Sequence, residues 1–424
     1  MKLPSLSKRQ PQTGSPLKRL PEHYMFIKQI CAASVFLLVS IWIVAAWIYG
    51  SLYQLDDRTK HLKILLVDLD GDVIGRVVSH GAAAVSGSKG LATFIFPQNT
   101  SKYNIESAYD YVFRGRYWGA LIAMPNATRS FNQAITSGDT THKPSPALLS
   151  IWNEARWALV GESVISPSIQ LATTTAQALY NAEYASNLIS NNSLTVAQSN
   201  VLLQPFELTT RNIYPFSTGI KPFINTVGFV FPTLIQFFFS MALTKISAQA
   251  HIHARLSPLR NYMIRFFLSR LWSFLIALSS AGWFFAFAES RTGAKPHTYI
   301  LVALNMWIYT LISFEYHDIC AVYIPIKFLP VSVLVWIIAN VTAAAFPCVL
   351  KPAIYRVEYA VPSVNIFEIF GTILSGGAGN TLGRNLGVLF AWLVVTGLGG
   401  WVANASRCHA ARERERIEKM LDGV

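Results

Sequence analysis

Three ionisable residues, Glu315, His317 and Asp318, directly follow a long apolar run, and all three can bind and release protons. Ionisable side chains within or beside a membrane span are costly to bury and often mark a path for protons or for a substrate. Asn305 adds an amide inside the same run. We therefore predict a proton or substrate path at Asn305, Glu315, His317 and Asp318. Two alternatives stay open: an interfacial position for the three ionisable side chains, and an interhelical hydrogen bond for Asn305.

A second acidic motif, ILLVDLDGD, runs from Ile64 to Asp72. It resembles the strand and D-x-D loop of the haloacid-dehalogenase-like phosphatases, in which one Asp is the nucleophile, the next is an acid/base and Mg²⁺ lies between them. This chain departs from that pattern because Asp72 stands where the family has Thr or Val, and no later acidic metal pair follows in the same domain. We therefore expect a strand that ends in an Asp/Gly turn. Catalytic residues, a metal site and a cofactor are not expected, and the protein is predicted not to be an enzyme.

The apolar runs indicate which elements position these residues. The stretch from Ile30 to Tyr49 has no charged residue, and about 20 apolar residues are sufficient to cross a bilayer core of about 30 Å. Hydrophobic residues make up 52% of the chain and charged residues only 13%, whereas soluble domains have about 25% charged residues. The chain is therefore an integral membrane protein. Further spans are predicted over 223–243, 266–288, 299–314, part of 319–350, and 386–402.

The positions of the basic residues orient these spans. The formal net charge is +13, and Lys and Arg concentrate on the cytoplasmic side of membrane proteins. Basic residues cluster before the first span, after the second and after the last, so both termini should be cytoplasmic. Membrane lipids are the expected partners of the N-terminal cluster, and nucleic acid is not expected. The three clusters contain Lys2, Lys8, Arg9, Lys18, Arg19 and Lys28, then Lys245, His251, His253, Arg255, Arg260 and Arg265, then Arg407, Arg412, Arg414, Arg416 and Lys419.

The predicted fold is a membrane α-helical bundle of about six transmembrane helices, with an α/β extracytoplasmic domain inserted between the first and second spans. In that domain, short apolar runs at 62–67 and 117–124 predict strands. Helices are predicted over 104–113, 128–135 and 169–189. The expected parts of the chain are a basic cytoplasmic tail (1–29), the first transmembrane helix (30–50), the extracytoplasmic domain (51–221), a five-helix bundle with an outer re-entrant hairpin (222–405) and a cytoplasmic C-terminal tail (406–424).

Glycosylation signals agree with this topology. The N-x-[ST] acceptors Asn99, Asn126 and Asn191 all fall in the predicted extracytoplasmic domain, as expected of a plasma-membrane or secretory-pathway protein. Asn404 also begins such a sequon, but it should face the cytosol and stay unmodified. The domain contains no cysteine, so no disulfide is expected in it.

Several motifs, taken in their order along the chain, resemble one membrane family. Val67–Gly71 (VDLDG), Gly115–Pro125 (GRYWGALIAMP) and Ile151–Arg156 (IWNEAR) resemble the outer domain of the phage-infection-protein-like membrane proteins. The segment Leu382–Trp392 resembles the branch of fungal nitrosoguanidine-resistance proteins. The C-terminal hairpin of the family is matched by Ala343–Pro347, Lys351–Pro352, Ala360–Pro362, Phe367–Gly371 and Gly376–Gly377.

This resemblance implies a bundle similar to type-2 ABC permeases, with helix-breaking segments that enter the outer leaflet between the fifth and sixth spans. The fungal branch is linked to resistance against a toxic alkylating compound, and its members have no fused ATPase. One expected function is therefore export of toxic small amphiphiles or movement of lipids, driven by a separate energising protein or a proton gradient. The other is a non-transporting scaffold or sensor that acts through its extracytoplasmic domain. A homo-oligomer is compatible with either function.

Overall fold

The chain forms two compact units, residues 1–49 and 50–424. Helix α1 (Leu20–Ser51) forms the described part of the first unit and ends two residues beyond it. Its apolar side chains, such as Ile41 and Trp42, are largely exposed, and a helix that is apolar on all sides is typical of a membrane span. The computed structural model describes residues 20–98, 102–137, 147–186, 207–216, 219–287 and 295–422, together with residues 198, 202 and 205.

The second unit begins with a sheet region, residues 55–216, built on a five-stranded sheet of order β2-β1-β3-β4-β5. Strand β1 pairs in parallel with β2 and β3, so that Leu65 lies between Ile95 and Ala120. Strand β4 runs antiparallel to β3 and parallel to β5. Strands β1 and β3 lie where short apolar runs predict strands. The strands are β1 (Lys63–Asp68), β2 (Thr93–Ile95), β3 (Gly119–Ala123), β4 (Leu148–Trp152) and β5 (Leu208–Asn212).

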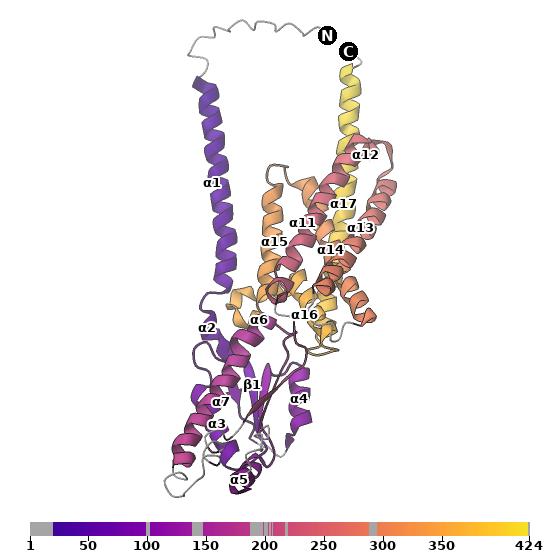
Figure 1. Ribbon diagram of the computed structural model, residues 1–424. Helices are drawn as coiled ribbons and strands as arrows, with labels where there is room; N and C mark the ends of the chain where they lie inside the picture. The colour runs from indigo at the N-terminus through magenta and orange to yellow at the C-terminus, as the bar shows by residue number, and fades with distance from the viewer. Residues whose placement is uncertain are drawn as a thin grey trace, which may run out of the picture. The chain divides into compact units, whose positions relative to one another are not determined.

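Helices cover both faces of this sheet (Figure 1). They are α3 (Val73–Val85), α4 (Ile105–Phe113), α5 (Ala127–Ser137) and α7 (Ser166–Tyr180). Successive strand residues point to opposite faces, so Ile64 and Leu66 of β1 pack in one core with α3 and α7, whereas Leu65 and Val67 pack against α4. Burial on both faces explains the uninterrupted apolar run of β1. The predicted helices correspond to α4, α5 and α7, whereas α3 was not predicted.

Where α3 and α7 cross, a Cβ on Gly81 would lie 2.6 Å from the backbone nitrogen of Ala176, so only glycine permits this close contact.

Short elements connect the longer helices and strands. Two π-helical segments flank α7, Gly161–Ile165 and Asn181–Ala185. The remaining short elements are α2 (Leu55–Arg58), α6 (Ala158–Val160) and the 3₁₀ segments Thr59–His61, Cys348–Leu350 and Ala353–Ala360.

A helical bundle follows the sheet region, and α14 is its central helix. More of α14 is buried than of any other long apolar helix among the described residues, because it packs against α11, α13, α16 and α17. The helices of the bundle are α10 (Lys221–Ile224), α11 (Val227–Gln249), α12 (Ile252–Arg255), α13 (Pro258–Ala286), α14 (Pro296–Tyr323), α15 (Leu329–Ala345), α16 (Pro362–Leu374) and α17 (Leu382–Asp422).

The described residues include five helices long and apolar enough to cross a membrane, or six if the pair Ala353–Ala360 and Pro362–Leu374, bent by 75°, forms one broken span. About six spans were predicted. The bent pair lies in the segment expected to form a re-entrant hairpin, whereas α15, in the expected fifth span, has only 17 residues. Several predicted helix ends differ. Helix α13 begins at Pro258 and not near 266, α14 continues past Phe314 to Tyr323, and α17 continues through the expected tail to Asp422.

The sheet region and the bundle share one continuous hydrophobic core. Trp157 is at the centre of this junction, because its indole Nε1 donates to the carbonyl oxygen of Ala344 at 3.1 Å and its ring lies 5.1 Å from that of Phe367. Helix α16 approaches closely here, since a Cβ on Gly371 would lie 2.6 Å from the carbonyl oxygen of Ala155. These contacts fix α16 against the sheet region.

Candidate functional site

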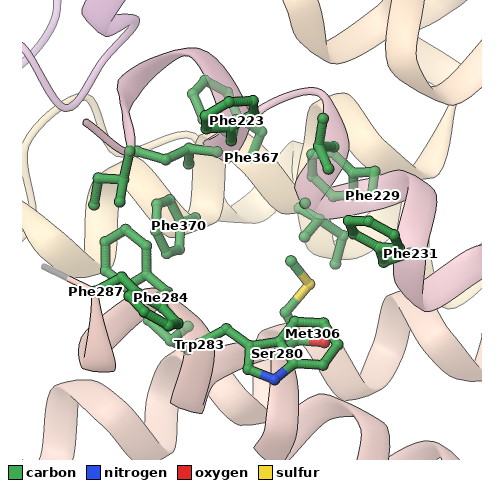
Figure 2. Close-up of a pocket in the computed structure, with 16 residues that line it drawn as sticks. Phe223, Phe229, Phe231, Ser280, Trp283, Phe284, Phe287, Met306, Phe367 and Phe370 are labelled. Carbon is green, nitrogen blue, oxygen red and sulfur yellow. The ribbon is translucent and has the colours of Figure 1, made fainter. Parts of the chain in front are cut away.

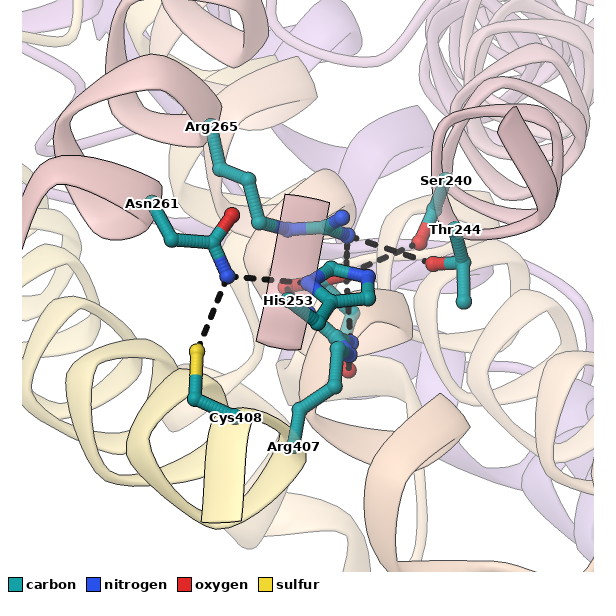
Figure 3. A network of polar contacts seen from close by, with 8 residues as sticks. Ser240, Thr244, His253, Asn261, Arg265, Arg407 and Cys408 are labelled. Carbon is teal, nitrogen blue, oxygen red and sulfur yellow. Dashed lines mark hydrogen bonds and ion pairs between the residues drawn. The ribbon is translucent and has the colours of Figure 1, made fainter. Parts of the chain in front are cut away.

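Asp318 of α14 is the centre of a buried polar network. Figure 3 shows the other members of the network, among them Arg265, Arg407 and Ser240. Its carboxylate forms ion pairs with Arg265 of α13 and with Arg407 of α17, whose Nη2 lies 3.0 Å from Oδ1. From α11, Ser240 Oγ donates to the same oxygen at 3.4 Å, and Thr244 accepts a hydrogen bond from Arg265 at 3.2 Å. One carboxylate therefore connects α11, α13, α14 and α17.

The charged side chains of this network are buried, so each depends on its partner. The side chains of Arg265 and Asp318 are 4% and 5% exposed. Two charges taken out of water gain little net stability from their attraction, but removal of one partner leaves the other uncompensated and costs about 3–5 kcal/mol. Because each arginine comes from a different helix, the network fixes the relative positions of α13, α14 and α17.

The two arginines lie in helices and not in the loop and tail that the sequence predicted for them. Arg265 is in α13 and Arg407 is in α17, and both side chains point to Asp318 inside the bundle. Their sequence separations from Asp318, 53 and 89 residues, explain why no local spacing revealed the pairing. The sequence signal for such a buried arginine is a basic residue at the edge of an apolar run, and the same pattern is also typical of a loop.

His253 and Asn261 extend the network toward α17. Asn261 Nδ2 lies 2.9 Å from His253 Nδ1 and 3.0 Å from Cys408 Sγ. Burial, together with the positive charges of Arg407 and Arg265, lowers the pKa of His253 to about 4. The imidazole is therefore neutral at pH 7, and its Nδ1 is free to accept the hydrogen bond from Asn261. Neither residue was predicted to have a functional role.

Glu315 is on the same side of α14 as Asp318, one helical turn earlier. Its Oε1 accepts a hydrogen bond from Arg270 at 3.2 Å, and its side chain is 8% exposed whereas that of Arg270 is 27% exposed. Glu315 and Asp318 both line a cavity of about 10 Å³ that Asn404 also lines. This volume is close to the minimum for one water molecule.

His317 and Asn305 do not join these carboxylates. The His317 ring is buried between Phe237 and Tyr316, at 5.6 and 5.4 Å, and neither ring nitrogen has a hydrogen-bond partner in the part of the chain that the structure describes. Asn305 Nδ2 donates to the carbonyl oxygen of Ile366 at 2.9 Å. This is the interhelical hydrogen bond considered as an alternative for Asn305. The four residues of the predicted path therefore occupy three separate places on α14. That they conduct protons or a substrate stays a prediction.

The carboxylates of the D-x-D loop have structural partners. Asp68 Oδ1 accepts hydrogen bonds from the backbone of Asp70 and Gly71 at 3.0 and 2.9 Å. The Asp70 carboxylate accepts from the backbone and hydroxyl of Thr128 at 2.9 and 2.5 Å. Asp72 is the N-cap residue of α3, and its carboxylate accepts a hydrogen bond from the nitrogen of the next residue, Val73. The predicted strand and Asp/Gly turn are confirmed, and these bonds connect β1 to α3 and α5.

One predicted glycosylation acceptor lies within the described residues. Asn126 is exposed in the turn between β3 and α5 and has a φ of 58°. The hydroxyl of its sequon, on Thr128, is buried against Asp70, so a glycosyltransferase would have to act before this turn folds. Asn99 and Asn191 lie outside the described residues. Glycosylation stays a prediction for all three.

A separate apolar cavity of about 300 Å³ lies in the bundle, between α10, α11, α13, α14 and α16. Figure 2 shows aromatic rings around an open centre into which the side chain of Met306 points. Phe223, Phe231 and Phe287 line the cavity and are also exposed on the surface, so the cavity opens onto the surface of the bundle. Ser280 is the polar residue in a lining that otherwise consists of Ile220, Phe223, Ile224, Val227, Gly228, Phe229, Phe231, Trp283, Phe284, Phe287, Val302, Met306, Ile366, Phe367 and Phe370.

The cavity and the charged network occupy different halves of α14. Met306 lines the cavity and Asp318 is in the network, which places them about 18 Å apart at 1.5 Å per residue. Asn305 is next to the cavity, because its hydrogen bond goes to Ile366, one of the lining residues. The cavity could not be predicted from the sequence, because its walls come from apolar runs that predict only spans.

The comparisons with known proteins agree on the class of protein. An uncharacterized endoplasmic reticulum membrane protein of Saccharomyces cerevisiae is 21% identical over 382 residues, which cover 82% of this chain and 74% of the relative. No solved structure matches the chain significantly. With the long apolar helices, this relative supports a multi-pass integral membrane protein. A family described as "Protein of unknown function (DUF3533)" matches residues 33–398. Because that match spans most of the sequence, the chain belongs to the DUF3533 family.

Proposed function

We propose that this protein binds a small amphiphilic molecule, a membrane lipid or a toxic compound of similar chemistry, and contributes to its movement across the membrane. The apolar cavity is the observation that supports this most directly. Its volume of about 300 Å³ is at the lower end for ligand pockets, which are about 300–1,000 Å³. It suits the apolar part of an amphiphile that enters from the lipid between Phe223, Phe231 and Phe287.

The proposed orientation places the sheet region outside the cytoplasm and both termini in it. The endoplasmic reticulum is the proposed membrane, because the yeast relative is named for it; another secretory-pathway membrane or the plasma membrane is the alternative. The protein acts without chemistry of its own, so net pumping needs a proton gradient or a separate energising protein. Glu315 is the candidate proton carrier, since its carboxylate is buried beside the partly exposed Arg270.

The alternative is a non-transporting scaffold or sensor. Two observations favour it: Asp318 connects helices through buried ion pairs, and one hydrophobic core continues from the sheet region into the bundle. Both features stabilise a single arrangement of the helices. In this alternative a lipid in the cavity is a structural component and does not cross the membrane.

A flux assay with a matched pair of variants separates the two functions. We expect purified protein in liposomes to move a fluorescent lipid or a labelled alkylating compound between leaflets or across the bilayer. Met306→Trp fills the cavity and should reduce both flux and photolabelling by a lipid probe. Met263→Trp is the control, because Met263 is 41% exposed on α13 and does not line the cavity.

The two proposed functions predict different outcomes in this assay. Flux that depends on a pH gradient supports proton coupling, and flux without a gradient supports facilitated movement. Labelling of Met306 without any flux, in the presence or absence of a gradient, favours the scaffold. Normal flux and labelling in a folded Met306→Trp protein would show that the cavity is not the binding site.

A further inference from the structure

A second pocket, of about 250 Å³, lies at the junction of the sheet region with α16 and α17. Its lining includes Trp118, Arg156, Pro347, Glu368 and Arg384. These residues are far apart in sequence, yet each belongs to a segment through which the chain resembles a membrane family. The segments are Gly115–Pro125, Ile151–Arg156, Ala343–Pro347, Phe367–Gly371 and Leu382–Trp392.

Arg156 lacks a carboxylate partner in this pocket. Its guanidinium carbon lies 3.9 Å from the centre of the Trp118 ring, and its Nη1 donates to the carbonyl oxygen of Tyr117 at 3.2 Å. No carboxylate of the described residues lies within ion-pair distance of Arg156, and its Nε and Nη2 make no hydrogen bond to them. A guanidinium with unused donors is costly to bury unless an anion or water satisfies it.

The one carboxylate in the pocket lining is already occupied. Glu368 forms an ion pair with Arg384 and accepts a hydrogen bond from Thr381 at 3.1 Å. At the rim, Arg114 is paired with Asp110 at 2.8 Å. Burial lowers the pKa of Arg156 to about 10, so the guanidinium still has its charge at neutral pH. The pocket therefore has an excess of positive charge.

Asn153 supplies a second donor. Its Oδ1 accepts a hydrogen bond from the nitrogen of Ala155 at 3.1 Å, which orients the amide. Its Nδ2 has no hydrogen-bond acceptor in the part of the chain that the structure describes. Asn153 and Arg156 both line the pocket, so an amide N–H and a guanidinium are available to one ligand.

We propose that this pocket binds an anionic group, a phosphate or a carboxylate, through Arg156 and Asn153. The planar guanidinium fork matches two oxygens of either group. The anion would supply the negative charge to pair with the guanidinium of Arg156. The source is the headgroup of an anionic lipid or a free soluble anion. This site is distinct from the apolar cavity, because Phe367 and Phe370 line that cavity whereas Glu368 and Gly371 line this pocket. Binding here does not require transport.

Equilibrium binding to the full-length protein in detergent tests the proposal. The probes are short-chain phosphatidic acid, inorganic phosphate and short-chain phosphatidylcholine, which has the same tails but no net charge. We expect phosphatidic acid to bind saturably and phosphatidylcholine not to bind. Competition by inorganic phosphate would identify a soluble anion as the ligand, and its absence would identify a lipid headgroup. Equal binding of phosphatidic acid and phosphatidylcholine, or binding of neither phosphatidic acid nor phosphate, would overturn the proposal.

Variants then locate the site. Arg156→Gln should weaken binding by about tenfold or more, as expected when a charge-assisted hydrogen bond is lost. Asn153→Asp keeps the acceptor for the nitrogen of Ala155 but adds a negative charge, so it should abolish binding even if Arg156→Gln does not fold. Arg211→Gln is the control, because Arg211 also lies over an aromatic ring, that of Tyr109 at 4.1 Å, but outside the pocket. Wild-type affinity in a folded Arg156→Gln or Asn153→Asp protein would refute the assignment.

Discussion

At the scale of single residues, the two buried carboxylates of α14 have different surroundings. Asp318 is paired with two arginines, Arg265 and Arg407, which are 4% and 10% exposed. Glu315 has Arg270, which is 27% exposed and can reach water when the pair is broken. The same chemical change should therefore have unequal effects at the two positions.

We predict that Asp318→Asn destabilises the protein by about 3–5 kcal/mol, the cost of a buried charge that loses its partner. Glu315→Gln should cost less, because Arg270 can be solvated. Thermal unfolding of both purified variants, with their yields from membranes, measures the difference. Equal unfolding temperatures for Asp318→Asn and the wild type would mean that the network does not stabilise the bundle.

This difference also affects the interpretation of functional assays. A loss of activity in Asp318→Asn does not by itself indicate proton transfer, since the variant is expected to be poorly folded. Glu315→Gln is the informative variant. If Glu315 binds the coupled proton, flux in Glu315→Gln should no longer respond to a pH gradient while the amount of protein is unchanged.

At the scale of elements, the sequence predicted which segments are helical better than where the helices end. Apolar runs identified α11, α13, α14 and α17, because a membrane span needs about 20 apolar residues. The ends were misplaced where polar side chains continue inside the bundle. Helix α14 includes Glu315 and Asp318 because neighbouring helices supply their partners, and α13 begins before Arg265 for the same reason. Tertiary contacts of this kind leave no periodic signal in one sequence.

In the D-x-D loop, the sequence predicted the local structure but not its distant contacts. The turn after β1 could be predicted, because Asp and Gly are the residues that such a turn requires. Its bonds to Thr128 could not, since they depend on a helix that follows a different strand. For the same reason, the sequence identified the segments around Arg156 but not the pocket that they form together.

Helix α16 gives a prediction at this scale. A Cβ at Gly371 would lie 2.6 Å from the carbonyl oxygen of Ala155, and neither backbone can move without disturbing the junction at Trp157. We expect Gly371→Ala to destabilise the protein by about 1–3 kcal/mol, the usual cost of overpacking. Limited proteolysis should then release the sheet region from the bundle more readily than in the wild type.

Gly383 in α17 provides the matched control, because a Cβ there meets no heavy atom within 4 Å. Replacement of a helical glycine by alanine favours the helix by about 0.5–1 kcal/mol. Gly383→Ala should therefore be as stable as the wild type or more stable. If Gly371→Ala and Gly383→Ala have the same unfolding temperature and protease sensitivity, α16 is not held tightly against the sheet region.

At the scale of the whole molecule, the shared core has a consequence for topology. Trp157 and Phe367 pack together, so the sheet region and the α16 end of the bundle lie on the same side of the membrane. In the proposed orientation, which rests on charge placement, that side faces away from the cytoplasm. The buried positions of Arg265 and Arg407 remove two basic residues from this argument, but Arg255, Arg412 and other basic residues outside the spans still favour a cytoplasmic position for the opposite end.

Glycosylation tests this orientation, and the structure indicates which variant to use. Asn126 has a left-handed backbone with a φ of 58°, a conformation that Asn and Asp tolerate better than other side chains. Asn126→Asp therefore removes the acceptor and keeps the turn, whereas Asn126→Gln would also strain it.

We expect the wild-type chain, made in the presence of endoplasmic reticulum membranes, to show a glycosidase-sensitive mobility shift that decreases in Asn126→Asp. Asn404→Gln should leave the shift unchanged, because Asn404 lies in the half of the bundle assigned to the cytoplasmic side. A shift that depends on Asn404 and not on Asn126 would reverse the orientation, and the sheet region would then face the cytosol.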